Sequence, residues 1–478
     1  MTQTAILADL SPARRKLAFS ILLTGSLLPS LNTFIVTIAL PVIRGALGAS
    51  EAQTSLIVTG YASAFSVCLI TGGRLADLYG RRLVFILGTA GFTLASLGAG
   101  LAPEPTTLVV GRTLQGLFGA AMVPPVLAAL RTLFKGEEIP WALNIYGTGI
   151  GVAVAGGQLL GGVLIAADIA GLGWRAPFLI NVPIGLALIG AALAFVPESG
   201  GSEKPRLDIV GVILLSAALG CFVVGLSLGR ERGWPAWDLG MIAAAPLLLA
   251  LFFVFEKRIA REGGMPLIDP ALLRIKSFSR GLVVALLFFF TMPFYIFFSI
   301  YLQAGLGEGA LAAGLAVLPY GVANFLGPLS ASRAPHALRR WLFGLGMTLQ
   351  IVVGYAGVGL CAWTQTGGIP LFIALFAGGF GQGVAMPEMI HTILGDIPPA
   401  HTGLAAGAMN STLQIGAAVS VASIGSLFFV ILGGGSGAVA YGHALGITMA
   451  AICVMLTGSM ILGILNQARR GATAPSRT

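Results

Sequence analysis

Charged side chains are scarce in this sequence. Aspartate, glutamate, lysine and arginine together make up 9% of its 478 residues, whereas soluble globular domains carry about 25%. Hydrophobic residues account for 56% of the chain, and its mean hydropathy is +0.93. So few polar groups could not cover a folded chain of this length in water. An ordinary soluble protein is therefore excluded, and lipid is the expected solvent.

Cysteine is also rare, and the four cysteines are spread along the chain at Cys68, Cys221, Cys361 and Cys453. Each lies inside an apolar run, and their spacing fits neither a metal site nor a disulfide framework. We interpret them as small buried hydrophobic residues. The sequence thus predicts no metal site, and no cofactor is expected.

Long apolar runs are abundant instead. A helix needs about 20 mainly apolar residues to cross the hydrocarbon core of a bilayer, and fourteen runs are of this order. They lie near residues 17–40, 54–72, 83–101, 106–130, 141–166, 176–196, 209–228, 239–255, 279–302, 308–330, 341–363, 369–391, 402–432 and 444–466. The first run is longer than the core of a signal peptide, so we expect it to be retained as a helix.

The basic residues predict the orientation of these helices. With the N-terminus in the cytoplasm, 22 of the 27 lysines and arginines lie on the cytoplasmic side. The exceptions are Arg112, within a helix, and four residues outside, Arg44, Arg175, Arg230 and Arg232. Because cytoplasmic loops are enriched in basic residues, we predict a multi-pass protein of the cell (inner) membrane with both termini cytoplasmic. The net charge of +9 follows this face and does not indicate nucleic-acid binding.

Two polar segments divide the chain. A polar linker at 198–207 and a basic loop at 256–280 enclose two helices, and six runs lie on either side of them. The predicted parts are an N-terminal six-helix bundle (1–200), a linker with two extra transmembrane helices and a basic cytoplasmic loop (201–275), and a C-terminal six-helix bundle (276–478).

A weak internal repeat relates the two bundles. Gly73, Arg81, Arg82 and Gly88 recur in order as Gly327, Arg339, Arg340 and Gly346, and Gly116 and Pro124 recur as Gly379 and Pro387. Two like halves that face a central cavity are the usual plan of a secondary transporter.

The densest hydrophilic stretch between two apolar runs spans residues 73–82. It resembles the G-x-L-A-D-x-x-G-R-R/K loop between the second and third helices of the major facilitator superfamily, and the matching residues are Gly73, Asp77, Gly80, Arg81 and Arg82. We expect a tight membrane-surface loop whose glycines permit a turn. The resemblance implies a latch that holds the outward-open state and breaks when the transporter turns inward. The alternative is an ordinary cytoplasmic loop with basic anchors.

A second resemblance lies in residues 108–116, which match the L-x-x-x-R-x-x-Q-G segment in the fourth helix of the drug:proton antiporters of this superfamily. Arg112 would lie roughly 9 Å inside its helix. A charge at that depth is costly unless it snorkels to the surface or is paired. We expect Arg112 and Gln115 to handle protons or substrate in a cavity, with snorkelling as the alternative.

The fifth predicted helix contains Gly157, Gly161 and Gly162, which resemble the antiporter signature ending in G-P-x-x-G-G. Glycines at this spacing make a smooth face, so helix packing explains most of the segment. Gln158 stands where the family has proline, and the kink that proline would cause is therefore not expected.

The chain resembles the fourteen-helix drug:proton antiporter branch over nearly its whole length, most specifically in segments 31–41, 174–185 and 266–269. Where that branch has a membrane-embedded aspartate, this chain has Asn32. A carboxylate can exchange a proton, whereas an amide cannot at ordinary pH. Arg112 therefore lacks an acidic partner. Either amides such as Gln115 and Gln158 satisfy it together with carbonyl groups, or it faces an anionic group of the substrate.

Other residues could exchange protons. Glu388 lies near the cytoplasmic end of the twelfth run, and its neighbour His391 has a side chain suited to proton transfer near neutral pH. The alternative is an interfacial pair that faces water. His391 and Asp396 also match the H-x-x-x-x-D spacing of some membrane acyltransferases. No further catalytic groups cluster with them, so we do not expect an enzyme.

We therefore predict an all-α membrane protein of the major facilitator fold, with two six-helix bundles plus two extra central helices, fourteen transmembrane helices in all. The resemblance implies export of lipophilic or amphipathic small molecules, such as drugs, by alternating access in exchange for protons. The expected partners are a small-molecule substrate, protons and the lipid bilayer, with a monomer as the assembly and no nucleic acid. The alternatives are a facilitator or metabolite exporter of the same fold without first-helix proton coupling, and a polytopic membrane enzyme.

Overall fold

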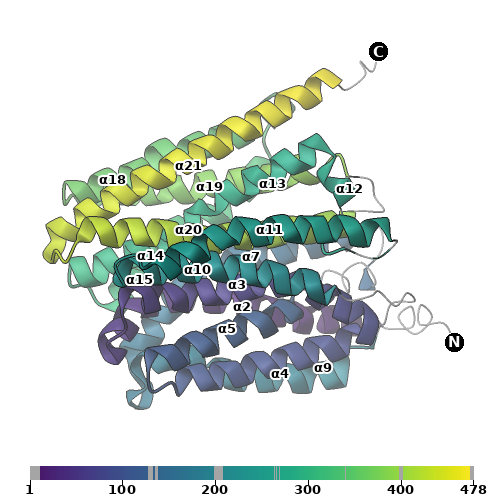
Figure 1. Cartoon of the computed structure of the whole chain (residues 1–478), viewed down its shortest axis with the longest axis horizontal. Helices are drawn as coiled ribbons and strands as arrows, with labels where there is room; N and C mark the ends of the chain where they lie inside the picture. Colours follow the sequence, from purple (N-terminus) through teal and green to yellow (C-terminus); the bar gives the residue numbers. More distant parts are fainter. Residues whose placement is uncertain are drawn as a thin grey trace. The chain divides into compact units, whose positions relative to one another are not determined.

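The structure is a computed structural model, and every regular element in its described part is a helix or a helical turn (Figure 1). It describes residues 11–126, 133–134, 138–198, 208–262, 264, 266–268, 270–339, 341–397 and 402–473. The predicted all-α class is confirmed.

The chain divides into two compact units, Met1–Leu267 and Ile268–Thr478. The helices of the first unit are α2 (Pro12–Leu47), α3 (Glu51–Tyr79), α4 (Arg81–Gly100), α5 (Pro105–Met122), α7 (Glu138–Ala167), α8 (Ala176–Leu179), α9 (Asn181–Phe195), α10 (Ile209–Glu231) and α11 (Ala236–Arg261). Those of the second unit are α12 (Pro270–Leu273), α13 (Lys276–Phe288), α14 (Met292–Ile300), α15 (Ala310–Ser332), α16 (His336–Arg339), α17 (Leu342–Thr348), α18 (Ala356–Trp363), α19 (Ile369–Leu394), α20 (Thr402–Leu432) and α21 (Gly437–Thr473).

Within the described residues, twelve helical segments are long and apolar enough to cross a membrane. The chain is therefore a multi-pass membrane protein, as predicted. Helices also occupy the two remaining predicted runs. α5 is less apolar because it contains Arg112 and Gln115, and the described side chains of α7 cover only the shorter apolar segment Gly156–Ala167. The count of fourteen spanning helices thus stays a prediction. The run predicted at 106–130 is longer than α5, which ends at Met122.

A three-residue turn joins α2 to α3 and makes them neighbours. Gly48 ends α2 in the left-handed conformation, at φ 63°, which glycine adopts without steric cost. Ser50 and Gln53 then form a capping box: Gln53 N–H donates to Ser50 Oγ (3.1 Å), and Ser50 N–H donates to Gln53 Oε1 (3.0 Å). The chain reverses at once, so α3 runs back along the bundle that α2 begins.

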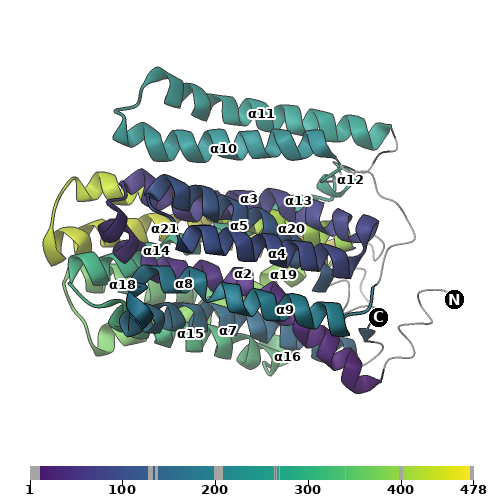
Figure 2. The same cartoon turned by 90° about the horizontal axis from the view of Figure 1, so that it is seen from below.

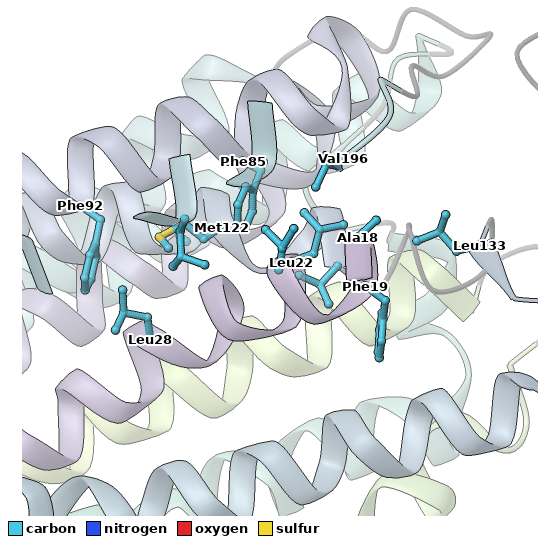
Figure 3. Close-up of a cluster of buried hydrophobic side chains, with 14 of the residues drawn as sticks. Ala18, Phe19, Leu22, Leu28, Phe85, Phe92, Met122, Leu133 and Val196 are labelled. Atoms are coloured by element: carbon cyan, nitrogen blue, oxygen red, sulfur yellow. The ribbon is translucent and has the colours of Figure 1, made fainter. Parts of the chain in front are cut away.

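A buried aromatic and aliphatic cluster holds the first unit together. Phe85 and Phe92 of α4 gather with Leu22 and Leu28 of α2 and Met122 of α5 (Figure 3). All five side chains are buried. In lipid, such a cluster stabilises the fold mainly through close packing rather than through removal from water.

The same close helix crossing occurs in both units. Gly116 of α5 faces the backbone of Tyr61 in α3, and Gly379 of α19 faces the backbone of Tyr320 in α15. In both places a Cβ atom would overlap the tyrosine carbonyl oxygen, so only glycine permits this approach. The predicted equivalence of Gly116 and Gly379 therefore has a structural basis.

A second pair of crossings supports the repeat, whereas the predicted pair of Gly73 and Gly327 has different nearest neighbours. A Cβ on Gly88 would lie 3.1 Å from the carbonyl oxygen of Phe118, and one on Gly346 would lie 2.8 Å from that of Gly381. A Cβ on Gly73 would lie nearest Pro124, whereas one on Gly327 would lie nearest Phe380, Gly383 and Val384.

The two extra helices form an antiparallel hairpin. α10 and α11 lie side by side in both views (Figures 1 and 2), and α10 packs against α3. Gly233 and Trp234, with φ values of 72° and 59°, form the turn between them. The hairpin thus belongs to the compact first unit, while the division into bundles of 1–200 and 276–478 with a separate linker at 201–275 stays a prediction.

Candidate functional site

Arg112 lies at the centre of the first unit and is completely buried. Its Nε donates to the carbonyl of Ile57 (3.1 Å), and its Nη1 donates to Asn32 Oδ1 (2.6 Å) and Gln115 Oε1 (2.8 Å). The guanidinium carbon also lies 4.2 Å from the centre of the Tyr61 ring, within the range of a cation–π interaction. All of these partners are neutral. The structure therefore brings Asn32, Arg112 and Gln115 together, and Arg112 does not snorkel.

Further hydrogen bonds fix the orientation of these partners. Gln115 Nε2 donates to Ser96 Oγ (2.6 Å), and the Ser96 hydroxyl donates to the Phe92 carbonyl (2.7 Å). Because its amide nitrogen is engaged there, Gln115 presents its oxygen to Arg112. The Tyr61 hydroxyl donates to the Pro29 carbonyl (2.9 Å), which holds the ring beside the guanidinium.

Gln158 lies in a separate contact. Its Nε2 donates to Thr37 Oγ1 at 3.5 Å, and its Oε1 has no partner among the described residues. Of the two amides that the sequence suggested as partners of Arg112, Gln115 therefore bonds to it, whereas Gln158 bonds to α2 at Thr37.

The glycines beside Gln158 lie against α2. A Cβ on Gly157 would be 2.9 Å from the Leu31 carbonyl oxygen, and one on Gly161 would be 2.9 Å from that of Ile35. Gly162 is also buried. α7 thus approaches α2 closely on the turns that flank Asn32.

The stretch predicted as a surface loop is mostly helix. α3 continues through Gly73 to Tyr79, Gly80 is the single linking residue, and α4 begins at Arg81. Gly80 has a φ of 101°, so it makes the turn, whereas Gly73 does not. The side chain of Asp77 lies outside the described residues. The expectation that both glycines form the turn is therefore wrong.

Glu198 contacts this turn, and sequence reasoning placed it in a polar linker instead. The Arg82 backbone N–H donates to Glu198 Oε1 (3.2 Å), and Arg82 Nε lies 3.6 Å from Glu198 Oε2. Arg82 Nη1 also donates to the Val196 carbonyl (3.3 Å). A carboxylate at the N-terminus of α4 is stabilised by the helix dipole. The sequence signal for this contact was the position of Glu198 just after the sixth predicted run, at the same membrane face as residues 73–82.

A second buried arginine joins α3 to the hairpin. Arg74 donates to the Pro266 carbonyl and interacts electrostatically with Asp208 and Glu256. Burial lowers the pKa of Arg74, and the two carboxylates oppose that shift. Gly211 completes the cluster, since a Cβ there would meet both Asp208 and Glu256. In the described part of the chain, the buried carboxylates are these two and Asp238, all on or beside α10 and α11.

The second unit contains an aromatic cluster. Tyr320 and Tyr355 are joined by a hydroxyl–hydroxyl hydrogen bond (2.8 Å), and Tyr320 also donates to Gln382 Oε1. Phe294 and Tyr295 pack against the Tyr320 ring and are buried. These aromatic residues of the ninth predicted run therefore face the interior of their own unit.

Glu388 and His391 lie on the last turns of α19 in the second unit. Glu388 is partly buried, and its backbone carbonyl accepts from the Thr392 hydroxyl (2.8 Å). His391 is exposed. Among the ion pairs of the described residues, none joins these two side chains. Asp396 lies beyond the end of α19, in a turn.

These helices and buried polar groups define an all-helical, multi-pass membrane protein with a repeated helix crossing in its two units. The chain belongs to the Major Facilitator Superfamily, whose sequence model matches residues 22–421. It is therefore a member of a transporter family rather than of an enzyme family.

Similar proteins include several that are named for transport, export or antibiotic resistance. The "Probable actinorhodin transporter" of Streptomyces coelicolor is 35% identical over 88% of this chain and 74% of its own length. The "Tetracenomycin C resistance and export protein" of Streptomyces glaucescens is 34% identical over 84% and 74%. The "Puromycin resistance protein pur8" of Streptomyces alboniger is 32% identical over 87% and 82%.

Among solved structures, a bacterial homolog of the human lysosomal transporter Spinster has the same fold. Its TM-score is 0.68 at 17% identity, and the match covers 98% of this chain and all of that chain. At this identity the likeness supports the fold alone.

The turn at Gly80 generates a testable prediction. Gly80→Ala should lower the free energy of unfolding by about 1–3 kcal/mol, because an alanine is strained at a φ of 101° and its Cβ would also meet the Glu198 carboxylate. Thermal unfolding in detergent measures the change. Gly190→Ala in α9, with no atom within 4 Å of its Cβ, is the control.

Glu198→Ala separates the two causes. In that background the collision with the carboxylate is gone, so Gly80→Ala should cost less than in the parent but still more than Gly190→Ala. Equal effects of Gly80→Ala and Gly190→Ala would contradict this description of the turn.

Proposed function

We propose that this protein is a secondary active transporter that exports lipophilic or amphipathic small molecules, including antibiotics and other drugs, by alternating access in exchange for protons. One observation carries the proposal: family membership together with relatives named for antibiotic export and resistance, matched over more than four-fifths of this chain. The finer features proposed with it are fourteen spanning helices, cytoplasmic termini in the cell membrane and a monomeric assembly.

The turn between α3 and α4 is the proposed latch. Gly73, Asp77, Gly80, Arg81 and Arg82 match the family loop. The contact of Arg82 with Glu198 adds a carboxylate to the same turn. In this proposal Asp77 supplies the acidic part of a latch that forms and breaks once in each transport cycle.

The buried network around Arg112 is the proposed centre of substrate handling. It places a cation and several amides in the buried interior of the first unit. Intramembrane ionisable residues commonly mark the path of a substrate or proton. Asn32, Gln115 and Gln158 would contribute hydrogen bonds, and Gly157, Gly161 and Gly162 would let α7 approach α2 there.

Proton exchange needs a group that titrates, and Asn32 is not one. Glu388 and His391 of the second unit are the proposed candidates, and the buried carboxylates Asp208 and Glu256 are further ones. The specific observation that favours a facilitator or metabolite exporter without first-helix coupling is the Asn32 amide oxygen at 2.6 Å from Arg112. That contact occupies the place where a carboxylate would exchange its proton.

Transport by inside-out vesicles tests the proposed function. With the vesicle interior acidified, puromycin or tetracenomycin C should accumulate inside, because proton exit would drive uptake of the exported compound. A protonophore should abolish the accumulation. Vesicles without the protein are the control.

Two outcomes contradict parts of the proposal. Uptake of neither compound, with or without a pH gradient, would oppose the export function. Protein-dependent uptake that is indifferent to the gradient would oppose proton exchange and favour the facilitator. If Asn32→Asp then makes uptake depend on the gradient, the substitution at this position explains the difference.

The latch generates a second prediction. Asp77→Asn should slow efflux from cells by about tenfold or more, since losing one charged hydrogen bond in a conformational step costs about 1.5–3 kcal/mol. The measurement is efflux of a fluorescent substrate at matched membrane levels of protein. Efflux as fast as in the parent would exclude a latch through Asp77, and Asp168→Asn, on a connection far along the chain, serves as the control substitution.

A further inference from the structure

The hydrogen bonds of Arg112 are incomplete. A guanidinium has five N–H groups. In this structure the Nε N–H donates to the carbonyl of Ile57, and the two N–H groups of Nη1 donate to Asn32 and Gln115. The two N–H groups of Nη2 are buried and have no partner among the described residues.

Asn32 also has unused donors. Because its Oδ1 accepts from Arg112 Nη1, the orientation of the amide is determined, since the nitrogen could not accept that bond. Its Nδ2 is buried and has no partner among the described residues. Arg112 and Asn32, which the 2.6 Å hydrogen bond joins, therefore both have N–H groups that donate to no acceptor among the described residues.

Among the described residues, no buried carboxylate balances the positive charge of Arg112 either. The buried carboxylates of the described chain are Asp208, Glu256 and Asp238. The first two interact with Arg74, and Asp238 lies 4.0 Å from Arg232. Arg112 thus has neutral acceptors and one aromatic ring, an arrangement in which burial of a full charge is unfavourable.

We infer that Arg112 Nη2 and Asn32 Nδ2 form an anion-binding site, and that it takes the carboxylate of a weakly acidic organic solute. A carboxylate has two oxygens that each accept N–H groups, and it neutralises the guanidinium, which a water molecule does not. The inference rests on the proposed export function and adds one chemical class of solute to its substrates. Arg112 is fully buried here, so the solute reaches the site in another conformation of the proposed alternating-access cycle.

The chain's own residues offer a sharp test of this inference. Asn32→Asp keeps the size of the side chain and the position of Arg112 but supplies an internal carboxylate. It should therefore remove the need for an external anion. Arg112→Gln removes the charge and should abolish anion binding as well.

The experiment measures thermal unfolding of the purified full chain in detergent while sodium benzoate is added at constant ionic strength. Benzoate should raise the unfolding midpoint of the parent in a saturable way, and benzamide, with the same ring and no charge, should not. Neither Asn32→Asp nor Arg112→Gln should respond to benzoate. Because Asn32→Asp retains the arginine, the test does not depend on the folding of Arg112→Gln.

The remaining outcomes are also decisive. If chloride gives the same saturable rise and requires the same residues, the anion site is supported with a small inorganic anion as its occupant. A benzoate response that persists unchanged in Asn32→Asp would overturn the site. If the vesicles transport but benzoate has no Arg112-dependent effect, the inference fails while the export function stands. If benzoate binds but no transport occurs, the export function fails instead.

Discussion

The buried charge of Arg112 is the constraint around which the first unit is arranged. Its neighbours are a backbone carbonyl, two amides and a tyrosine ring, and further hydrogen bonds orient Gln115 and Tyr61. The close crossing of α3 and α5 is part of this arrangement, because Gly116 lets the backbone of Tyr61 approach α5. A larger residue at 116 would separate the two helices and draw the Ile57 carbonyl away from the guanidinium.

Helix α3 connects this network to the other charged features of the unit. Near its start it supplies Ile57 and Tyr61 to Arg112, and near its end Arg74 joins the buried carboxylates of the hairpin. One residue after its last turn, Gly80 packs against Glu198. A displacement of α3 would therefore change the Arg112 network, the hairpin contact and the proposed latch together. This continuity is a physical route by which events at the buried site could reach the membrane surface.

Much of the fold could be predicted because apolar runs and family motifs are local signals. All fourteen predicted runs contain helix. The family match in residues 73–82 correctly placed a turn at the second glycine of the motif, Gly80. Gly73 was misassigned because helix and turn are both compatible with glycine, and only the φ of Gly80 distinguishes them. The repeat was aligned by the order of a few glycines, arginines and prolines, and glycine is a weak signal in a chain with 68 of them.

The charged contacts of the first unit were less predictable. The partnership of Arg74 with Glu256 and that of Arg82 with Glu198 join residues far apart in sequence, and hydropathy assigns all of them to polar ends of helices. The family motifs identified both Asn32 and Arg112 as candidate site residues. Sequence could not show that Asn32 accepts a hydrogen bond while its own N–H groups have no partner among the described residues.

The most direct test of this account compares two aspartate substitutions in the ligand-free protein. Asn32 and Asn181 are both almost completely buried in the first unit, but only Asn32 contacts Arg112. If the charge of Arg112 is unbalanced, Asn32→Asp will raise the thermal unfolding midpoint above that of the parent. Asn181→Asp, which buries a carboxylate without a cation, will lower it. A fall of similar size for both variants would contradict the central claim.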